Sequence, residues 1–530
     1  MNEEFLQRRP YNAASEFIDA NVVRGLGDKV AFADPDRTLT YSTLQSRSVQ
    51  FARALQRLGV RPEQRIAIFL HDTVDFPVVF WGTIRAGVIA LPLNTLLTPE
   101  QYAYMLADSR ATLLVIEAAL AKSIAPILDR LPCLRQIVLV GEGDASAFAG
   151  RAVHRFEDLL AAENTAPFTA PTVSDEVAFW LYTSGSTGDP KGVRHVHASL
   201  MATAKLMGQR TLGITENDVV YSAAKLYFAY GLGNAMSFPL SVGATSILWP
   251  HRATPDAVLD LMQRHRPSIF YGVPTLYASL LANGKLARGA GSDRLRVCVS
   301  AGEALPAPLG ERWREVVGVE ILDGIGSTEM LQTFLSNRPG DVRYGSTGRP
   351  VPGYEFKIVD ENGHEVPDGE IGELVVRGPS AGDGYWNQRE KTRRTFAGEW
   401  THTGDKFHRD SDGYYYYSGR TDDMFKVSGM WVSPFEVEAA LASHDAVLEA
   451  AVIGKEDRDG LIKPKAFVVL KNGIKPDDGL LEKLRLHVKE RAGPWKYPRW
   501  IDFRPELPKT ATGKIQRFKL RDQEGVAARR

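Results

Sequence analysis

Short apolar runs alternate with amphipathic stretches along the first part of the chain. Runs typical of buried strands occur at 66–70, 88–93, 112–116 and 136–140, with helical spacing of apolar residues at 41–58 and 99–107. The stretch PVVFWGTIRAGVIALPL at 77–93 predicts a buried helix followed by a strand. Strands that alternate with helices favour a doubly wound α/β body with largely parallel sheets.

A second series of the same kind follows. A strand at 177–182 and a helix within 193–206 enclose a polar loop, and later patterns predict a helix at 254–265 and strands at 268–271, 296–300 and 320–323. In parallel sheets, ligands bind where strands end at the carboxyl edge. We therefore expect a binding site at the ends of these strands.

The pattern changes after about residue 345. Clusters typical of antiparallel strands occur at 356–360, 372–377 and 413–418, with turns at Asn362-Gly363 and Asp412-Gly413. These predict a small β subdomain at about 345–421, within a large N-terminal domain of residues 1–421.

Residues 422–530 are long enough for a small domain of their own. A helix is predicted at 434–444, strands at 447–454 and 464–471, and a second helix at 479–493. The fold class is therefore α/β in the large domain and α+β overall.

Composition and charge exclude several classes of protein. Hydrophobic residues make up 44% and charged residues 24%, and Lys plus Arg equals Asp plus Glu at 64 each. No overall field therefore attracts nucleic acid or an anionic membrane, and an anionic ligand needs a local site. The only cysteines, Cys133 and Cys298, indicate no disulfide scaffold and favour a reducing cytoplasm. We expect no signal peptide and no membrane span, since the apolar stretch from Pro77 is short and contains Arg85.

The loop YTSGSTGDPKG at 182–192 combines glycines, hydroxyls and a lysine. Small residues let backbone N–H groups approach an anion, so the loop indicates phosphate binding. It is not a Walker A loop, because Pro190 replaces the second glycine and Gly192 replaces the hydroxyl that follows the lysine.

Four more polar clusters follow in order: DGIGSTE at 323–329, THTGD at 401–405, YSGRTDDMFKVSG at 417–429 and PKTATGKIQR at 508–517. With the loop at 182–192, they resemble the acyl-adenylate-forming superfamily of acyl-CoA synthetases, adenylation domains and firefly-type luciferases. The resemblance covers nearly the whole chain from about Tyr41. It implies ATP-dependent activation of a carboxylic acid through an acyl-AMP, with Mg²⁺ as the metal and CoA as a co-substrate.

The resemblance assigns ATP binding to a set of residues spread over these motifs: Thr183, Ser184, Ser186, Thr187, Lys191, Ser300, Gly302, Glu303, Asp323, Gly324, Ile325, Asp405 and Arg420. The loop at 182–192 would hold the β- and γ-phosphates, and Asp405 with Arg420 would hold the ribose hydroxyls. Ile325 stands where many relatives have a tyrosine against adenine, so apolar packing is expected to replace stacking there.

The resemblance also assigns the catalytic residues Lys514, Thr328 and Glu329. Thr328 would bind the α-phosphate, and Glu329 would hold Mg²⁺, a hard ion suited to carboxylate oxygens. Lys514 would neutralise the charge that builds between the substrate carboxylate and the α-phosphate. Asp422 would be the hinge about which a mobile C-terminal domain rotates, and Gly429 would admit CoA to its tunnel.

The segment KLYFAYGLGNAMSFPL at 225–240 lies where relatives have an aromatic loop beside the acyl pocket. Together with TSGSTGDPKGVRHVH at 183–197, it resembles benzoate and hydroxybenzoate CoA ligases of bacterial aromatic degradation. The residues assigned to the acid are Phe228, Ala229, Tyr230, Gly231 and Gly326. A ring-lined slot suits an aryl acid, although aromatic residues also cluster in cores for stability.

Several alternatives stay open at this point. Benzoate and 4-hydroxybenzoate are close rivals, because the sequence does not say which polar group reaches the far end of the slot. Loading of an aryl acid onto a carrier protein is the alternative to CoA, and a nucleotide-binding sensor without catalysis is the alternative of another class. The oligomeric state is open, with a homodimer among the choices.

Overall fold

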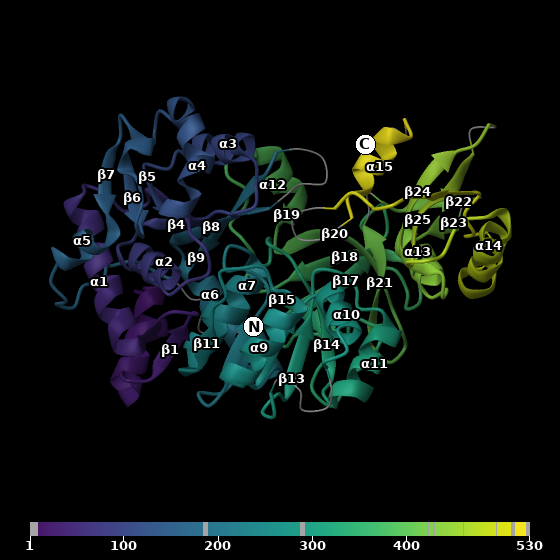
Figure 1. Cartoon of the computed structure of the whole chain (residues 1–530), viewed down its shortest axis with the longest axis horizontal. Helices are drawn as coiled ribbons and strands as arrows, with labels where there is room; N and C mark the ends of the chain where they lie inside the picture. Colours follow the sequence, from purple (N-terminus) through teal and green to yellow (C-terminus); the bar gives the residue numbers. More distant parts are fainter. Residues whose placement is uncertain are drawn as a thin grey trace. The chain divides into compact units, whose positions relative to one another are not determined.

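The computed structural model describes residues 9–183, 189–286, 292–420, 423–427, 430–458, 461–493, 495–509 and 515–525. They form two compact units, Met1–Glu355 with Val376–Thr401 and Phe356–Val375 with His402–Arg530 (Figure 1). The domain boundary expected between residues 421 and 422 lies outside the described residues and stays a prediction.

The first unit contains a seven-stranded sheet in the order β7-β6-β5-β3-β4-β8-β9. Its strands are β3 (Arg65–Phe69), β4 (Ile89–Pro92), β5 (Leu113–Glu117), β6 (Gln136–Val140), β7 (Ala152–Arg155), β8 (Val177–Thr183) and β9 (Lys191–Val196). All neighbours are parallel except β8 and β9. The strands predicted between residues 66 and 140, and the strand predicted at 177–182, are confirmed.

The same unit contains a nine-stranded sheet in the order β16-β15-β14-β13-β12-β10-β11-β1-β2. Its strands are β1 (Val30–Ala33), β2 (Thr38–Thr40), β10 (Val219–Ser222), β11 (Thr245–Ile247), β12 (Ile269–Gly272), β13 (Val297–Ser300), β14 (Ile321–Gly326), β15 (Thr333–Ser336) and β16 (Arg349–Pro350). The strands from β14 to β1 are parallel. The carboxyl ends of β10, β12, β13 and β14 therefore share one edge.

The helices of the first unit are α1 (Tyr41–Arg57), α2 (Asp75–Arg85), α3 (Pro99–Ser109), α4 (Ala121–Ile124), α5 (Phe156–Ala161), α6 (His197–Thr203), α7 (Ala229–Leu232), α8 (Phe238–Val242), α9 (Pro255–His265), α10 (Pro274–Ala282), α11 (Ala307–Val317) and α12 (Arg389–Thr395). Short π and 3₁₀ segments occur at Ser15–Asp19, Val22–Leu26, Ala118–Leu120, Ala125–Arg130, Ala145–Phe148, Ala204–Thr211 and Gly233–Ser237. Met262 of α9 and Trp313 of α11 belong to one buried hydrophobic cluster with Phe270 of β12.

Helix α2 is buried along its whole length, as the apolar pattern predicts. Its single cation, Arg85, is tolerated because the guanidinium bonds both carboxylate oxygens of Asp19, at 2.7 and 2.9 Å. A buried charge needs such a partner. Within the part of the chain that the structure describes, no helix has the length and apolar character required to cross a membrane.

The helix predicted within 193–206 is wrong at its start. Residues Lys191–Val196 form strand β9, antiparallel to β8, and the helix α6 begins only at His197. In this segment Val193 and His195 are buried while Arg194 and Val196 are partly exposed, which is the period-two pattern of a strand. The polar loop therefore joins two strands of a hairpin.

A third sheet has its strands in the order β17-β18-β20, and β21 also pairs with β20. These strands are β17 (Glu355–Val359), β18 (Gly372–Arg377), β20 (Trp400–Arg409) and β21 (Tyr415–Arg420), and the short β19 (Phe396–Ala397) pairs with the start of β20. The predicted turns are present, with φ of 83° at Gly363 and 82° at Gly413. The predicted β strands of this region are confirmed.

The rest of the second unit contains the hairpin of β22 (Phe425–Val427) and β23 (Met430–Val432) and the sheet β24 (Val447–Glu456), β25 (Ile462–Leu470) and β26 (Trp500–Phe503). Its helices are α13 (Pro434–Ala442), α14 (Asp478–Ala492) and α15 (Arg517–Gln523). The helices predicted near 434 and 479 and the strands predicted near 447 and 464 are confirmed.

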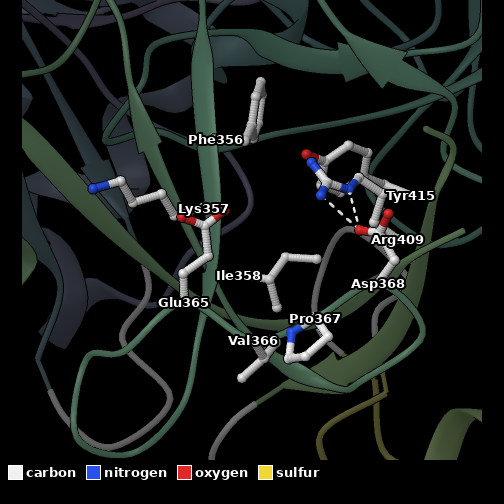
Figure 2. Close-up of a pocket in the computed structure, with 9 residues that line it drawn as sticks. All are labelled: Phe356, Lys357, Ile358, Glu365, Val366, Pro367, Asp368, Arg409 and Tyr415. Carbon is white, nitrogen blue, oxygen red and sulfur yellow. Dashed lines mark hydrogen bonds and ion pairs between the residues drawn. The ribbon is translucent and has the colours of Figure 1, made fainter. Parts of the chain in front are cut away.

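Figure 2 shows a small cavity beside β17, where Arg409 bonds Asp368 at 2.6 Å and the ring of Phe356 lies 5.6 Å from that of Tyr415. Its volume is about 10 Å³. This space suits a single water molecule and is far too small for an aromatic acid. We therefore interpret it as a packing feature of the β region.

Candidate active site

The carboxyl edge of the nine-stranded sheet brings several predicted ATP residues together. Ser300 at the end of β13 pairs in register with Asp323 of β14 and with Gly272 of β12. Gly302, which is exposed, and Glu303, which is half-buried, follow directly after β13.

Two buried polar atoms at this edge have no hydrogen-bond partner among the residues that the structure describes, namely Oγ of Ser300 and Oδ1 of Asp323. Burial raises the pKa of the Asp323 carboxyl well above its usual value, although backbone N–H groups of Leu305 and Gly324 act in the opposite direction. A buried polar group without a partner is costly, so these atoms suit a ligand with complementary hydrogen-bonding groups.

The chain leaves β14 through a sharp turn that carries Thr328 and Glu329, both half-buried. The N–H of Leu331 donates to the carbonyl of Thr328 at 3.1 Å, and Leu331 has a φ of 66°. A non-glycine residue in the left-handed region is uncommon and marks a constrained backbone. The turn thus holds the two predicted catalytic residues in a defined position beside the sheet edge.

The β8–β9 hairpin carries the predicted phosphate loop. Thr183 and Lys191 face each other in register at its end. Ser184, Ser186 and Thr187 lie outside the described residues. The half-buried Lys191 donates from Nζ to the hydroxyl of Tyr385 at 3.2 Å, and Nζ lies 4.3 Å from the centre of that ring.

His195 of β9 connects this hairpin to the turn after β14, and sequence reasoning missed it. Its Nε2 lies 2.8 Å from the carbonyl oxygen of Thr328, which can only accept, so Nε2 carries the proton. The ring is stacked on Phe179, with centroids 5.2 Å apart. Burial lowers its pKa to about 4, so it stays neutral at physiological pH.

Because the folded state lowers the pKa of His195, the unfolded chain binds the proton first as pH falls. Above pH 6.5, the pKa of the group in the unfolded chain, its protonation does not lower the free energy of unfolding. As pH falls toward 4, the free energy of unfolding decreases by up to about 3 kcal/mol, because only the unfolded chain binds the proton. His195→Gln, which keeps a donor for the Thr328 carbonyl but does not titrate, is expected to weaken the fall in thermal midpoint between pH 6.5 and 4. Midpoints of both proteins that fall in parallel would contradict this prediction.

The predicted acid-binding residues follow β10. Helix α7 starts at Ala229, and the hydroxyl of Tyr230 directs its one proton between the carbonyl oxygens of Gly272 and Val299, at 3.3 and 3.2 Å. These carbonyls lie on β12 and β13, so Tyr230 lies at the same sheet edge as Ser300. The half-buried ring of Phe228 lies edge-on to Tyr227, with centroids 4.7 Å apart.

The two glycines predicted for the acid site have a packing reason as well. A Cβ on Gly231 would lie 2.1 Å from the carbonyl oxygen of Lys225, and one on Gly326 would lie 2.6 Å from that of Gln332. Neither position has room for a side chain. The buried Gln332, also missed from sequence, donates to the carbonyl of Tyr230 at 3.0 Å and joins the two segments.

In the second unit, the two residues predicted to bind ribose contact each other, and their role stays a prediction. Asp405 of β20 is buried and faces Arg420 of β21 in register, with Nη1 of Arg420 donating to Oδ1 at 2.9 Å. Asp422, Gly429 and Lys514 lie outside the described residues. Asp423, which follows Asp422, accepts a hydrogen bond at 2.7 Å from Arg521 of α15, the helix that begins three residues after Lys514.

Models of known protein families match most of this chain. The AMP-binding enzyme family matches residues 19–386, and the AMP-binding enzyme C-terminal domain matches residues 436–514. The chain is 52% identical to a 4-hydroxybenzoate–CoA/benzoate–CoA ligase of Rhodopseudomonas palustris, over 97% of this chain and 94% of that protein.

Two solved structures are similar over nearly the whole chain. One is the anthranilate CoA ligase AuaEII in complex with anthranoyl-AMP, with a TM-score of 0.91, 44% identity, and coverage of 97% of this chain and 98% of that chain. The other is a benzoate CoA ligase from Burkholderia xenovorans LB400, with a TM-score of 0.88, 50% identity, and coverage of 96% and 100%. The family matches and these near-complete similarities show that the chain belongs to the AMP-binding enzyme family.

Proposed function

We propose that the protein is an AMP-forming aryl-CoA ligase for benzoate or a hydroxybenzoate. In the first half-reaction, a carboxylate oxygen of the acid attacks the α-phosphorus of ATP, and pyrophosphate leaves. In the second, the thiol of CoA attacks the carbonyl carbon of the aryl-AMP, and AMP leaves. The observation that carries the proposal is 52% identity, over 97% of this chain, to a ligase named for 4-hydroxybenzoate and benzoate.

The carboxyl edge of the nine-stranded sheet suits this chemistry. The turn with Thr328 and Glu329 and the ring of Tyr230 both lie at this edge, which favours a carboxylate and an α-phosphate meeting there. The hydroxyl of Tyr230 is already directed at two backbone carbonyls. We therefore assign Tyr230 to packing against the ring of the acid rather than to recognition of a ring hydroxyl.

Magnesium belongs to the proposal, and the residues present fit it. The carboxylate of Glu329 is half-buried and stands next to the Thr328 hydroxyl in sequence, so the turn offers hard oxygen donors. When bound, the ion would neutralise phosphate charge. Lys191 would hold the pyrophosphate end of ATP, and Asp405 with Arg420 would hold the ribose.

The C-terminal domain, residues 422–530, is proposed to supply Lys514 for adenylation and then to rotate about Asp422, so that Gly429 admits the pantetheine arm of CoA. Ion pairs between the segments next to Lys514 and Asp422 support their movement as one body. Arg517, three residues after Lys514, donates to Glu438 at 2.9 Å, and Arg521 donates to Asp423, which directly follows Asp422. The free thiols of Cys133 and Cys298 favour the cytoplasm as its location.

A panel of acids tests the function. The purified protein is incubated with ATP, Mg²⁺, CoA and one acid, which is benzoate, a hydroxybenzoate, anthranilate or a long-chain fatty acid. Acyl-CoA is measured by mass spectrometry. Aryl-CoA from benzoate or a hydroxybenzoate, with none from the fatty acid, is expected. If aryl-AMP accumulated and its aryl group were transferred only to an added carrier protein, the carrier protein would replace CoA as the proposed acceptor.

A further inference from the structure

We propose that Tyr385 is a positioning residue that couples the lysine of the phosphate loop to the carboxylate of Glu329. Its hydroxyl donates to Oε1 of Glu329 at 2.7 Å and accepts from Nζ of Lys191 at 3.2 Å, with Oγ1 of Thr395 at 3.4 Å. The inference rests on the proposed function, because it assigns a role to a contact between residues that would hold Mg²⁺ and pyrophosphate.

The backbone on either side of Tyr385 is fixed to both of the elements that it joins. Tyr385 forms an isolated antiparallel bridge with Val193 of β9, and the N–H of Trp386 donates to the carbonyl of Gly192 at 2.8 Å. The N–H of Gly382 donates to the carbonyl of Glu329 at 2.7 Å. Tyr385 is only 4% exposed, so its hydroxyl is held in place by its surroundings.

The chemistry of a phenol explains why this residue suits the position. A phenol has one proton to donate and lone pairs with which to accept, so it can satisfy a carboxylate and an ammonium at the same time. A neutral group between the two charges keeps them at a set separation, so that each can also face a ligand. The ring adds a cation–π attraction, because Nζ of Lys191 lies 4.3 Å from its centre.

A carboxylate that binds a metal is oriented by the group hydrogen-bonded to it, and loss of such a partner commonly lowers metal affinity about 10- to 100-fold. Tyr385 has that relation to Glu329. The geometry therefore points to control of both the Mg²⁺ affinity and the adenylation rate by Tyr385, acting through Glu329 and Lys191.

Tyr385→Phe is the test, because it removes only the hydroxyl and keeps the ring, which also packs edge-on against Phe396 with centroids 5.4 Å apart. Calorimetry measures binding of a non-hydrolysable ATP analogue at several Mg²⁺ concentrations. Exchange of pyrophosphate into ATP and thioester formation from supplied aryl-AMP are measured separately. Tyr41→Phe is the matched control, because it also loses one buried hydroxyl bond, to the carbonyl of Ala244 at 2.7 Å.

The expected result for Tyr385→Phe is a Mg²⁺ midpoint about 10-fold higher in the calorimeter and exchange about 10- to 100-fold slower. Thioester formation should be retained, and Tyr41→Phe should change none of these. An unchanged midpoint, or equal loss of both half-reactions, would overturn the proposal. Calorimetry needs no acid, so failure of the aryl-acid assignment is distinguishable from failure of this inference.

Discussion

Lys514→Ala is expected to slow aryl-acid-dependent exchange of pyrophosphate into ATP by about 10²- to 10³-fold. An anionic carboxylate approaches an anionic phosphate in this step, and a single cation placed between them offsets charge that builds only in the transition state. In the proposed cycle the C-terminal domain, residues 422–530, has rotated before CoA attacks. The variant should therefore form aryl-CoA from supplied aryl-AMP at a rate close to that of the wild type.

Lys509→Ala is the matched control for Lys514→Ala. Lys509 lies in the same segment, and its Nζ forms an ion pair with Glu449 at 2.6 Å, with the lysine side chain 37% exposed. Such pairs contribute about 0–1 kcal/mol, so both half-reactions should be retained. If Lys514→Ala slowed both half-reactions equally, or neither, the adenylation-specific role of Lys514 would be wrong.

Glu329→Gln is expected to slow the same exchange by about 10²-fold or more and to raise the Mg²⁺ concentration needed for half-maximal rate. The amide is close in size to the carboxylate and still accepts from Tyr385, but it lacks the charge that a hard cation needs. Loss of the charge therefore removes metal affinity and leaves the shape of the turn.

Glu320→Gln controls for the loss of one carboxylate. Glu320 precedes β14, and its Oε2 accepts from the N–H of Gly340 at 3.1 Å, a contact that an amide oxygen can replace. Exchange and Mg²⁺ dependence should match the wild type. A Glu329→Gln protein with an unchanged Mg²⁺ requirement would show that Glu329 does not hold the ion.

The periodic elements could be predicted because their signal is local. Strands such as β6 and helices such as α1 follow from apolar spacing over a few residues, and their residues lie in the elements expected. The β9 strand was missed because a short period-two segment, VRHV at 193–196, runs directly into the helix α6 and shares its apolar residues. The local pattern of apolar residues therefore does not show where β9 ends and α6 begins.

The contacts that organise the site could not be predicted, because they join distant parts of the chain. His195 bonds a carbonyl that lies 133 positions away in the sequence. Tyr385 bonds Lys191, which lies 194 positions away, and Glu329, which lies 56 positions away. No spacing rule links such positions. The motif residues Ser300, Asp323 and Glu329 were assigned through family resemblance, whereas the contacts of His195 and Tyr385 with the turn that carries Glu329 needed the tertiary structure.

The measurement that most directly tests activation of an aryl acid is exchange of labelled pyrophosphate into ATP with the wild-type protein. It reports reversible aryl-AMP formation and needs neither CoA nor a carrier protein. Exchange that depends on benzoate or 4-hydroxybenzoate and is absent with a long-chain fatty acid is the predicted result. No exchange above background with any aryl acid, from a folded protein supplied with Mg²⁺, would contradict the assignment.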